Sequence, residues 1–209
     1  MSRYIVITDI HGELNKLESV LSKIETRIDD IFVFLGDYID RGPDSKGVVD
    51  KVIDISKNFE TITLIGSHEY ALLHANIDYY NYLFWNYGGP ATVKSYGGKF
   101  ENILAIHGDF YRNLKFYHLT ERYLFVHAGI DPRYSLEDQS EEDLVYIRSA
   151  FYKNKHNLKQ KIIFGHTEFE APLVQEDKIC IDLGCGKYKD AKLCALILDN
   201  GKEDFVYSH

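Results

Sequence analysis

The sequence has only three cysteines, Cys180, Cys185 and Cys194, all within its last thirty residues. An odd and clustered set is not a disulfide framework, and no histidine accompanies Cys180 and Cys185 at a zinc-site spacing. We therefore expect small apolar core residues, with a metal or redox pair as the alternative. We also expect no secretory signal, because the first apolar run is short and Asp9 follows it at once. A reducing cytoplasm is the expected compartment.

Basic residues and long apolar runs are also scarce. The chain has 24 Lys and Arg against 32 Asp and Glu, for a net charge of −8. Nucleic acid needs a basic face, so it is not an expected partner. No run approaches the length of a transmembrane helix, so no membrane partner is expected either. The 209 residues, 45% of them hydrophobic, predict a single domain, 1–209, with a full core.

Three polar strings in the first third each follow an apolar, β-branched run. The runs are residues 4–7, 31–35 and 61–65, and they are typical of buried strands. The polar groups therefore lie where strands end, at one edge of a sheet, where α/β proteins carry their binding groups. The strings are Thr8-Asp9-Ile10-His11-Gly12, Gly36-Asp37-Tyr38-Ile39-Asp40-Arg41-Gly42 and Gly66-Ser67-His68-Glu69. Aspartates, histidines and an arginine together indicate a metal site that handles phosphate.

The remaining pattern predicts the organisation of the chain. Apolar residues recur at helical spacing over 14–24 and 48–55, which favours parallel strands with helical crossovers. Residues 69–114 read as a helical, aromatic-rich, cap-like segment, broken at Gly88-Gly89-Pro90 and resumed as a short helix over 91–96. Its aromatic residues, Tyr79 to Tyr87, form either a core stripe or a cap over the polar edge. Strands expected at 116–119, 123–126, 162–164, 172–174, 179–181, 193–198 and 205–207 suggest a second, mostly antiparallel sheet.

Two further histidines, His127 and His166, also follow apolar strands directly. A lone histidine there is more often structural, but five strand-end motifs in one chain make coincidence a poor explanation. Imidazole and carboxylate ligands together suit Mn, Fe or Zn rather than Ca. One carboxylate can bridge two metals roughly 3.5–4 Å apart, a pair that serves phosphoryl displacement. The candidate ligands are Asp9, His11, Asp37, His127 and His166, and Arg41 is placed to bind phosphate.

This series of motifs resembles the phosphoprotein phosphatase (PPP) family of calcineurin-like metallophosphoesterases, and above all its small bacterial and phage-type serine/threonine phosphatases. The family is recognised by GDxHG, GDxVDRG and GNHE, followed by HAG and GHT-like strings. Trp85-Asn86-Tyr87-Gly88-Gly89, with Ser95-Tyr96-Gly97 after it, is similar to another segment of that branch. The resemblance runs from Tyr4 to about Leu198. It implies an α/β fold, a two-sheet β-sandwich flanked by helices in four αββα layers.

The resemblance also implies a role for each matching residue. Asp9 and His11 would hold one metal, His127 and His166 the other, and Asp37 would bridge both. His68 would be the general acid, and Asp40 would orient it; a turn-stabilising aspartate is the alternative for Asp40.

Two arginines would bind phosphate. Arg41 matches the family motif, whereas Arg148 resembles the second arginine less closely, because Tyr146 stands in place of a tryptophan. A surface arginine paired with Glu141, Glu142 or Asp143 is the alternative for Arg148.

Two positions depart from the family pattern. Thr8 replaces a glycine, which looks tolerable because Asp9 is intact. Ser67 replaces an asparagine whose carbonyl oxygen would ligate the second metal, and a neutral hydroxyl is a poorer ligand. We therefore expect a weakly held second metal and an active or partly impaired enzyme.

The implied function is metal-dependent hydrolysis of phosphate monoesters through direct attack of a metal-bridging hydroxide. The expected substrates are phosphoserine and phosphothreonine, with phosphotyrosine as a further class. The cofactors would be two divalent ions, manganese first, with Fe, Zn or Ni as alternatives. The partner would be a phosphorylated protein or a small phosphoester. One alternative is a symmetrical diadenosine tetraphosphate hydrolase, using the aromatic stretch for stacking, although no basic cluster beyond the two arginines is evident. A second is a catalytically impaired metal- or phosphate-binding homologue, because of Ser67.

Overall fold

The computed structural model describes residues 2–209, which build two five-stranded sheets. In the first sheet the order is β10-β9-β1-β2-β3, and β1 pairs in parallel with β2 and antiparallel with β9. Its strands are β1 (Arg3–Ile7), β2 (Asp30–Phe34), β3 (Glu60–Thr63), β9 (Cys194–Asp199) and β10 (Lys202–Tyr207). In the second sheet the order is β4-β5-β6-β8-β7. Its strands are β4 (Tyr117–Leu119), β5 (Tyr123–Val126), β6 (Lys161–Phe164), β7 (Leu173–Val174) and β8 (Lys178–Cys180).

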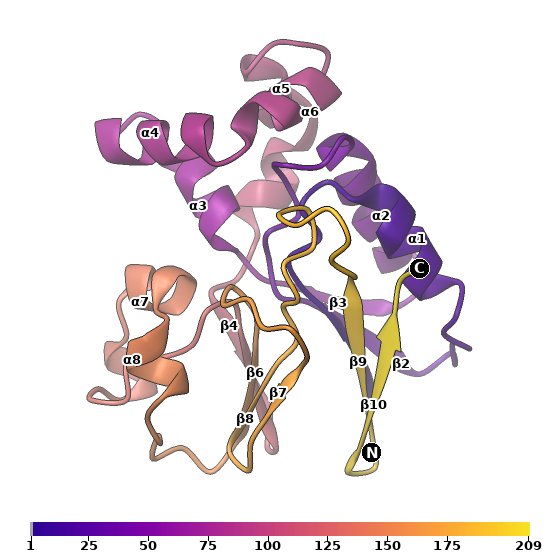
Figure 1. Ribbon diagram of the computed structural model, residues 1–209, viewed down its shortest axis with the longest axis vertical. Helices are drawn as coiled ribbons and strands as arrows, with labels where there is room; N and C mark the ends of the chain where they lie inside the picture. The colour runs from indigo at the N-terminus through magenta and orange to yellow at the C-terminus, as the bar shows by residue number, and fades with distance from the viewer. Residues whose placement is uncertain (1) are drawn as a thin grey trace.

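The two sheets pack face to face. Alternate strand residues point to opposite faces of each sheet, and one set of them lies between the sheets. Val6 and Val33 of the first sheet share a buried cluster with Phe125 and Ile163 of the second. The intervening residues of β1 and β2 pack under α1 (Leu14–Leu21) and α2 (Ser45–Ser56). Those of β5 and β6 pack under η1 (Leu136–Asp138), α7 (Glu141–Tyr146) and α8 (Ser149–Tyr152). Figure 1 shows α1 and α2 on one side of the sheets and α7 and α8 on the other, which confirms the four-layer αββα arrangement.

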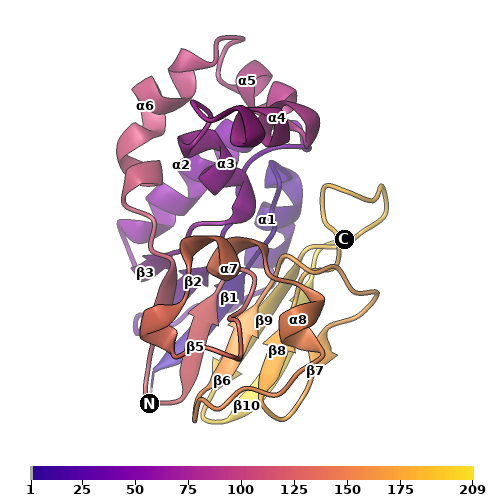
Figure 2. The ribbon, with the colours of Figure 1, turned by 90° about the vertical axis from the view of Figure 1, so that its left-hand side faces the viewer.

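Four helices form the cap-like segment. They are α3 (Ser67–Leu73), α4 (Asp78–Asn86), α5 (Gly89–Ser95) and α6 (Glu101–Arg112). Figures 1 and 2 show them together above one end of the sheets. The break between α4 and α5 falls at the predicted Gly88-Gly89-Pro90 string, with proline early in α5 where its missing N–H costs nothing.

The expectation of a mostly antiparallel second sheet is wrong. β5, β6 and β8 run parallel, and only the edge strands β4 and β7 are antiparallel. The α7–α8 segment supplies the crossover that a parallel pair needs between β5 and β6. The last two strands belong to the first sheet, where β9 pairs with β1 along its length. Within residues 2–209 no helix is both long and apolar enough to cross a bilayer.

Candidate metal centre

The carboxyl ends of the parallel strands of both sheets meet at one place. Asp9 follows β1, Asp37 follows β2, His127 follows β5 and His166 follows β6, and each is buried. His68 lies in the first turn of α3, just after β3. A cavity of about 490 Å³ opens there, lined among others by Asp9, His11, Asp37, Arg41, His68, Arg148 and His166. The structure therefore brings together all the residues that the sequence proposed, with His127 and Asp40 fully buried behind the cavity wall.

Asp37 lies at the middle of the donor set. Its Oδ2 is 3.7 Å from His11 Nε2 and 3.5 Å from His127 Nε2. Two groups of possible ligand atoms, each within 4.8 Å of one another, share this residue: His11, Asp37 and His68 in one, and Asp37, His127 and His166 in the other. A carboxylate common to two groups is the arrangement that a bridging ligand requires.

Asp9 links the same two groups. Its Oδ1 is 4.0 Å from His11 Nε2, and its Oδ2 accepts hydrogen bonds from the Thr8 hydroxyl at 2.6 Å and the His166 backbone N–H at 3.1 Å. The hydroxyl of Thr8, at the position of the expected glycine, thus supports the carboxylate. Burial raises the pKa of Asp9, and the nearby Asp37 charge adds to this.

The histidine rings are oriented from behind. Nδ1 of His11 lies 3.0 Å from the Ile39 carbonyl, and Nδ1 of His127 lies 3.0 Å from the Leu35 carbonyl. An Nδ1–H donated to a carbonyl leaves Nε2 unprotonated and free to ligate. His127 Nε2 is buried and has no hydrogen-bond partner in residues 2–209. A buried imidazole nitrogen beside carboxylates, without a hydrogen bond, fits a metal ligand.

The backbone at this edge is strained. Among residues 2–209, seven non-glycine residues have a positive φ, and six of them are site residues. Non-glycine residues rarely adopt this region, at a cost of roughly 1–3 kcal/mol each where the structure holds them there. The six are Asp9 (50°), His11 (48°), Asp37 (53°), Asp40 (73°), Arg41 (68°) and His166 (64°). Such clustering is typical of a preorganised functional site.

Glu69 holds the loop that carries Asp37, a role that the sequence did not reveal. Its fully buried carboxylate accepts hydrogen bonds from the backbone N–H of Asp37 (2.8 Å), Tyr38 (2.9 Å), Ile39 (3.3 Å) and Gly66 (3.1 Å). Burial and the Asp37 charge raise the pKa of Glu69 to about 7. Gly66 allows the two loops to touch, since a Cβ there would lie 2.2 Å from the Asp37 backbone nitrogen.

Behind His68 lies a chain of buried hydrogen bonds. Its Nδ1 is 2.6 Å from Asp40 Oδ2, and the Thr92 hydroxyl donates to Asp40 Oδ1 at 2.5 Å. The Asp40 backbone N–H donates back to Thr92 Oγ1 at 2.8 Å and to Ser45 Oγ at 3.0 Å. Burial alone would lower the pKa of His68, but the Asp37 charge and the Asp40 hydrogen bond outweigh it and raise that pKa.

Two arginines reach the cavity from different segments. Arg41 places Nη1 2.8 Å from His11 Nε2 and Nη2 3.2 Å from His68 Nε2, so its guanidinium points at the donor set. Arg148 is 46% exposed and lies 3.4 Å from Glu168. Arg148 is thus an exposed, ion-paired arginine as in the alternative, but its partner is Glu168 and not the α7 carboxylates, whose hydrogen bonds come from other residues: Glu141 and Glu142 accept from Tyr70 and Tyr80, and Asp143 accepts from Ser140.

The chain is similar to several known proteins. The profile of calcineurin-like phosphoesterases matches residues 2–209. The chain belongs to this family. A bis(5'-nucleosyl)-tetraphosphatase PrpE [asymmetrical] of Oceanobacillus iheyensis is 27% identical over 211 residues, which cover 86% of this chain and 83% of that protein. An uncharacterised metallophosphoesterase of Campylobacter jejuni is 34% identical, but the match covers 32% of this chain and 20% of that protein.

Solved structures share the fold of this phosphoesterase. A putative diadenosine tetraphosphatase superposes with a TM-score of 0.72 at 19% identity, covering 99% of this chain and 94% of that one. A protein serine/threonine phosphatase from Saccharomyces cerevisiae superposes with a TM-score of 0.67 at 17% identity, covering 99% and 79%. Family membership makes this chain a metal-dependent hydrolase, and its buried His and Asp groups are candidate metal donors.

The aromatic segment of the phosphoesterase serves both predicted purposes. Tyr80 and Phe84 are buried in the core, whereas Tyr79 and Tyr87 are exposed and line the cavity. The cavity wall also includes Lys187, a third cation beyond Arg41 and Arg148 that the sequence pattern did not reveal.

Ser67 lines the cavity, and its hydroxyl donates to Asp37 Oδ2 at 3.2 Å, so it contacts the shared carboxylate. Cys180, Cys185 and Cys194 are buried free thiols whose pKa values are raised by burial, and none belongs to a potential metal group in residues 2–209. They are core residues, as expected.

Proposed function

We propose that this phosphoesterase is a phosphatase that removes phosphate from serine and threonine side chains, with phosphotyrosine as a further class to test. The observation that carries this proposal is the convergence of an acid, His68, and a phosphate-binding group, Arg41, on a donor set that shares Asp37. A protonated imidazole beside a guanidinium suits the cleavage of an ester bond to phosphorus.

Five residues would hold two divalent ions: Asp9, His11, Asp37, His127 and His166. Their mixture of imidazole and carboxylate suits manganese, with Fe, Zn or Ni as alternatives. When bound, such ions lower the pKa of water so that hydroxide is available at neutral pH, and they neutralise charge on phosphoryl oxygens. Asp37 would be common to both ions.

The other residues bind the substrate and move the proton. Arg41 and Arg148 would each bind phosphoryl oxygens, for which the planar guanidinium offers two parallel donors. His68 would give its Nε2 proton to the leaving oxygen. Asp40 holds the opposite ring nitrogen at 2.6 Å, which fixes the ring and favours its protonated form.

A second candidate substrate is a dinucleoside polyphosphate. The cavity wall favours it, because Tyr79 and Tyr87 offer rings for stacking and Lys187 adds a cation. The 27% identical relative bears the name of a tetraphosphatase, which also supports this candidate. Values of kcat/KM measured side by side on a phosphoserine peptide and on diadenosine tetraphosphate will rank the two.

The basic test is turnover of p-nitrophenyl phosphate with added Mn²⁺, measured with metal content. We expect His68→Ala and Asp37→Asn to abolish it, while His118→Ala, a histidine on β4 outside the cavity, retains it. Absence of turnover by the unmutated protein with Mn, Fe, Zn and Ni would overturn the phosphatase proposal. It would favour a metal- or phosphate-binding homologue without catalysis.

A further inference from the structure

The loop that follows β8 is built against the metal centre. Asp182 is buried and accepts a hydrogen bond from the Gly184 N–H at 2.8 Å. Gly184 and Gly186 have φ values of +77° and +73°, a region that favours glycine. A Cβ on Gly186 would lie 2.6 Å from the Cβ of His11, so this backbone passes directly over a candidate ligand.

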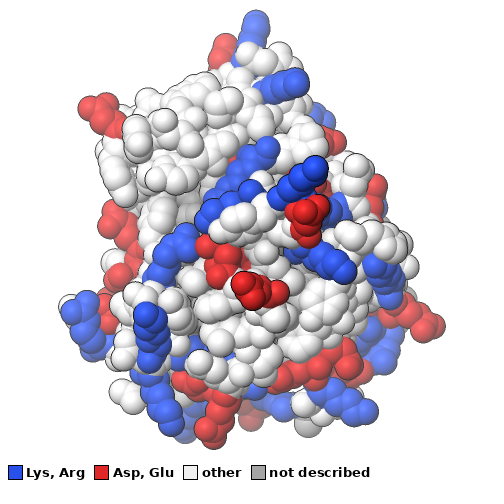
Figure 3. Space-filling view, in the orientation of Figure 1, with Lys and Arg blue, Asp and Glu red and all other residues white. Residues whose placement is uncertain are grey.

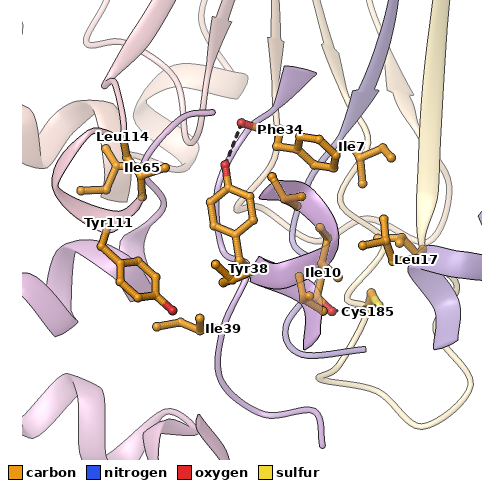
Figure 4. Close-up of a cluster of buried hydrophobic side chains, with 14 of the residues drawn as sticks. Ile7, Ile10, Leu17, Phe34, Tyr38, Ile39, Ile65, Tyr111, Leu114 and Cys185 are labelled. Carbon is orange, nitrogen blue, oxygen red and sulfur yellow. Dashed lines mark hydrogen bonds between the residues drawn. The ribbon is translucent and has the colours of Figure 1, made fainter. Parts of the chain in front are cut away.

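A buried thiol anchors the same loop from below. Cys185 is 1% exposed, and its Sγ lies 3.7 Å from the Ile10 carbonyl. Figure 4 shows it in the apolar cluster with Ile10 and Leu17. With Cys185 in the core and Gly186 against His11, the position of the next residue, Lys187, is fixed at the cavity wall.

Lys187 is one of two cations that share a carboxylate. Its Nζ lies 2.6 Å from Glu168 Oε1, and Arg148 Nη1 lies 3.4 Å from Glu168 Oε2. Glu168 follows His166 by two residues, so three separate segments bring these charges beside the metal centre. Figure 3 shows Lys and Arg side chains gathered across the middle of this face, below the helical cap, with acidic side chains beside them.

Arg148, Glu168 and Lys187 together carry a net positive charge, and they line the same cavity as Arg41. One phosphoryl group has few oxygens, and two arginines offer it up to four parallel N–H donors. A lysine is a point charge on a flexible stem, which can part from Glu168 and follow a neighbouring anion. The surplus cation therefore fits a second negative group rather than the scissile phosphate.

We propose that Lys187, positioned by Glu168, forms a second anion subsite that binds a negatively charged group adjacent to the scissile phosphate. This inference rests on the proposed function and deepens it, because it makes Lys187 a residue that determines substrate choice. The second anion can come from the next phosphate of a polyphosphate or from a carboxylate beside a phosphoserine, and the experiment distinguishes these sources.

The test compares the metal-loaded protein with Lys187→Ala, Lys187→Arg and Lys189→Ala. Lys189 is an exposed lysine of the same loop that does not line the cavity, so its variant is the matched control. The substrates are p-nitrophenyl phosphate, diadenosine tetraphosphate, and two phosphoserine peptides that differ only in an aspartate or alanine next to the phosphoserine.

Two of these substrates carry a second anion, diadenosine tetraphosphate and the aspartate peptide. For whichever of them the unmutated protein prefers, we expect Lys187→Ala to lower kcat/KM roughly tenfold relative to kcat/KM for p-nitrophenyl phosphate. Lys187→Arg should keep most of that ratio, and Lys189→Ala should not change it. A loss confined to the tetraphosphate identifies a phosphate chain, and a loss confined to the aspartate peptide identifies a carboxylate. Equal losses on all substrates, or no loss on any, would overturn the subsite.

Failure of the proposed function has a different signature, namely no turnover of any substrate by the unmutated protein. The subsite is then judged by calorimetric titration with pyrophosphate and with phosphate. We expect Lys187→Ala to weaken pyrophosphate binding more than phosphate binding. Equal binding of pyrophosphate by variant and unmutated protein would reject the inference.

Discussion

Thr92 is the residue whose replacement tests the catalytic geometry most sharply. It is fully buried in α5 and is not among the residues that line the cavity at the candidate metal centre, yet its hydroxyl donates to Asp40, which in turn holds His68. The exchange Thr92→Val keeps the shape of the side chain and removes only the hydroxyl. The Asp40 backbone N–H stays paired, because Ser45 also accepts from it at 3.0 Å. The exchange also removes the 2.9 Å hydrogen bond between the Thr92 and Ser45 hydroxyls, so the perturbation falls on the Asp40 carboxylate and on Ser45.

The expected size is set mainly by the contact with the charged Asp40 carboxylate. A hydrogen bond to a charged group contributes roughly 1.5–3 kcal/mol, which bounds the loss of stability. A positioned general acid contributes about 10²–10⁴-fold in rate, and a loosened one keeps part of this. We expect kcat to fall roughly 10- to 100-fold for substrates that need a proton on the leaving oxygen, with KM little changed because the arginines are untouched.

The assay varies the leaving group. Phenyl phosphate has a poor leaving group and depends on the acid, whereas 2,4-dinitrophenyl phosphate has a good one and does not. Thr92→Val should slow the first at least tenfold more than the second, and Thr92→Ser, which keeps the hydroxyl, should restore both. Equal slowing of the two substrates would show that Thr92 supports the fold alone and would refute the positioning argument.

Three further outcomes are expected. Glu69→Gln should lower the free energy of unfolding by about 3 kcal/mol in urea titrations, because an amide cannot accept all the hydrogen bonds that the Glu69 carboxylate accepts from buried N–H groups. The exposed Glu101→Gln is the control, and an unchanged urea midpoint for Glu69→Gln would contradict the assigned role. Ser67→Asn should raise both metal content and rate at limiting Mn²⁺, since an amide oxygen is the better ligand, and no change in either quantity would disprove this. Burial alone would lower the pKa of His127, but the Asp37 charge raises it from 6.5 to about 9. Between pH 7 and pH 9 the folded imidazole therefore holds a proton that the unfolded one has lost, so the melting temperature of chelator-treated protein should fall as the pH rises over this range. Excess Mn²⁺ should remove this trend. A melting temperature that rises over this range without metal would argue against it.

Much of the site could be predicted because its residues stand directly after strands. Asp9, Asp37, His127 and His166 each follow an apolar run that the sequence displays. Parallel strands bring their carboxyl ends to one edge, so local patterns were enough to gather these side chains. The helical spacing likewise predicted α1 and α2, whose apolar faces pack on β1 and β2.

The partners of these residues could not be predicted in the same way. Thr92 is 52 positions from Asp40, and nothing in a helix-forming string marks a hydroxyl that will meet a carboxylate. Glu69 was visible in its motif, but its four backbone donors come from loops that only the packed sheet brings together. Lys187 reads as a surface lysine until Cys185 and Gly186 fix its loop over His11.

The sheet assignment of the last strands shows the same division. Residues near 193–198 and 205–207 are predictable as strands from the sequence, because each is a short, continuous apolar run, which is typical of a buried strand. That β9 pairs with β1 rather than with a strand of the second sheet is visible only in the folded chain. The residues of a strand determine which of its faces can be buried. The strand with which it pairs depends on which sheet edge is unpaired when the chain folds. The residue types of the candidate site are thus predictable from local sequence patterns, whereas their positions depend on contacts across the fold.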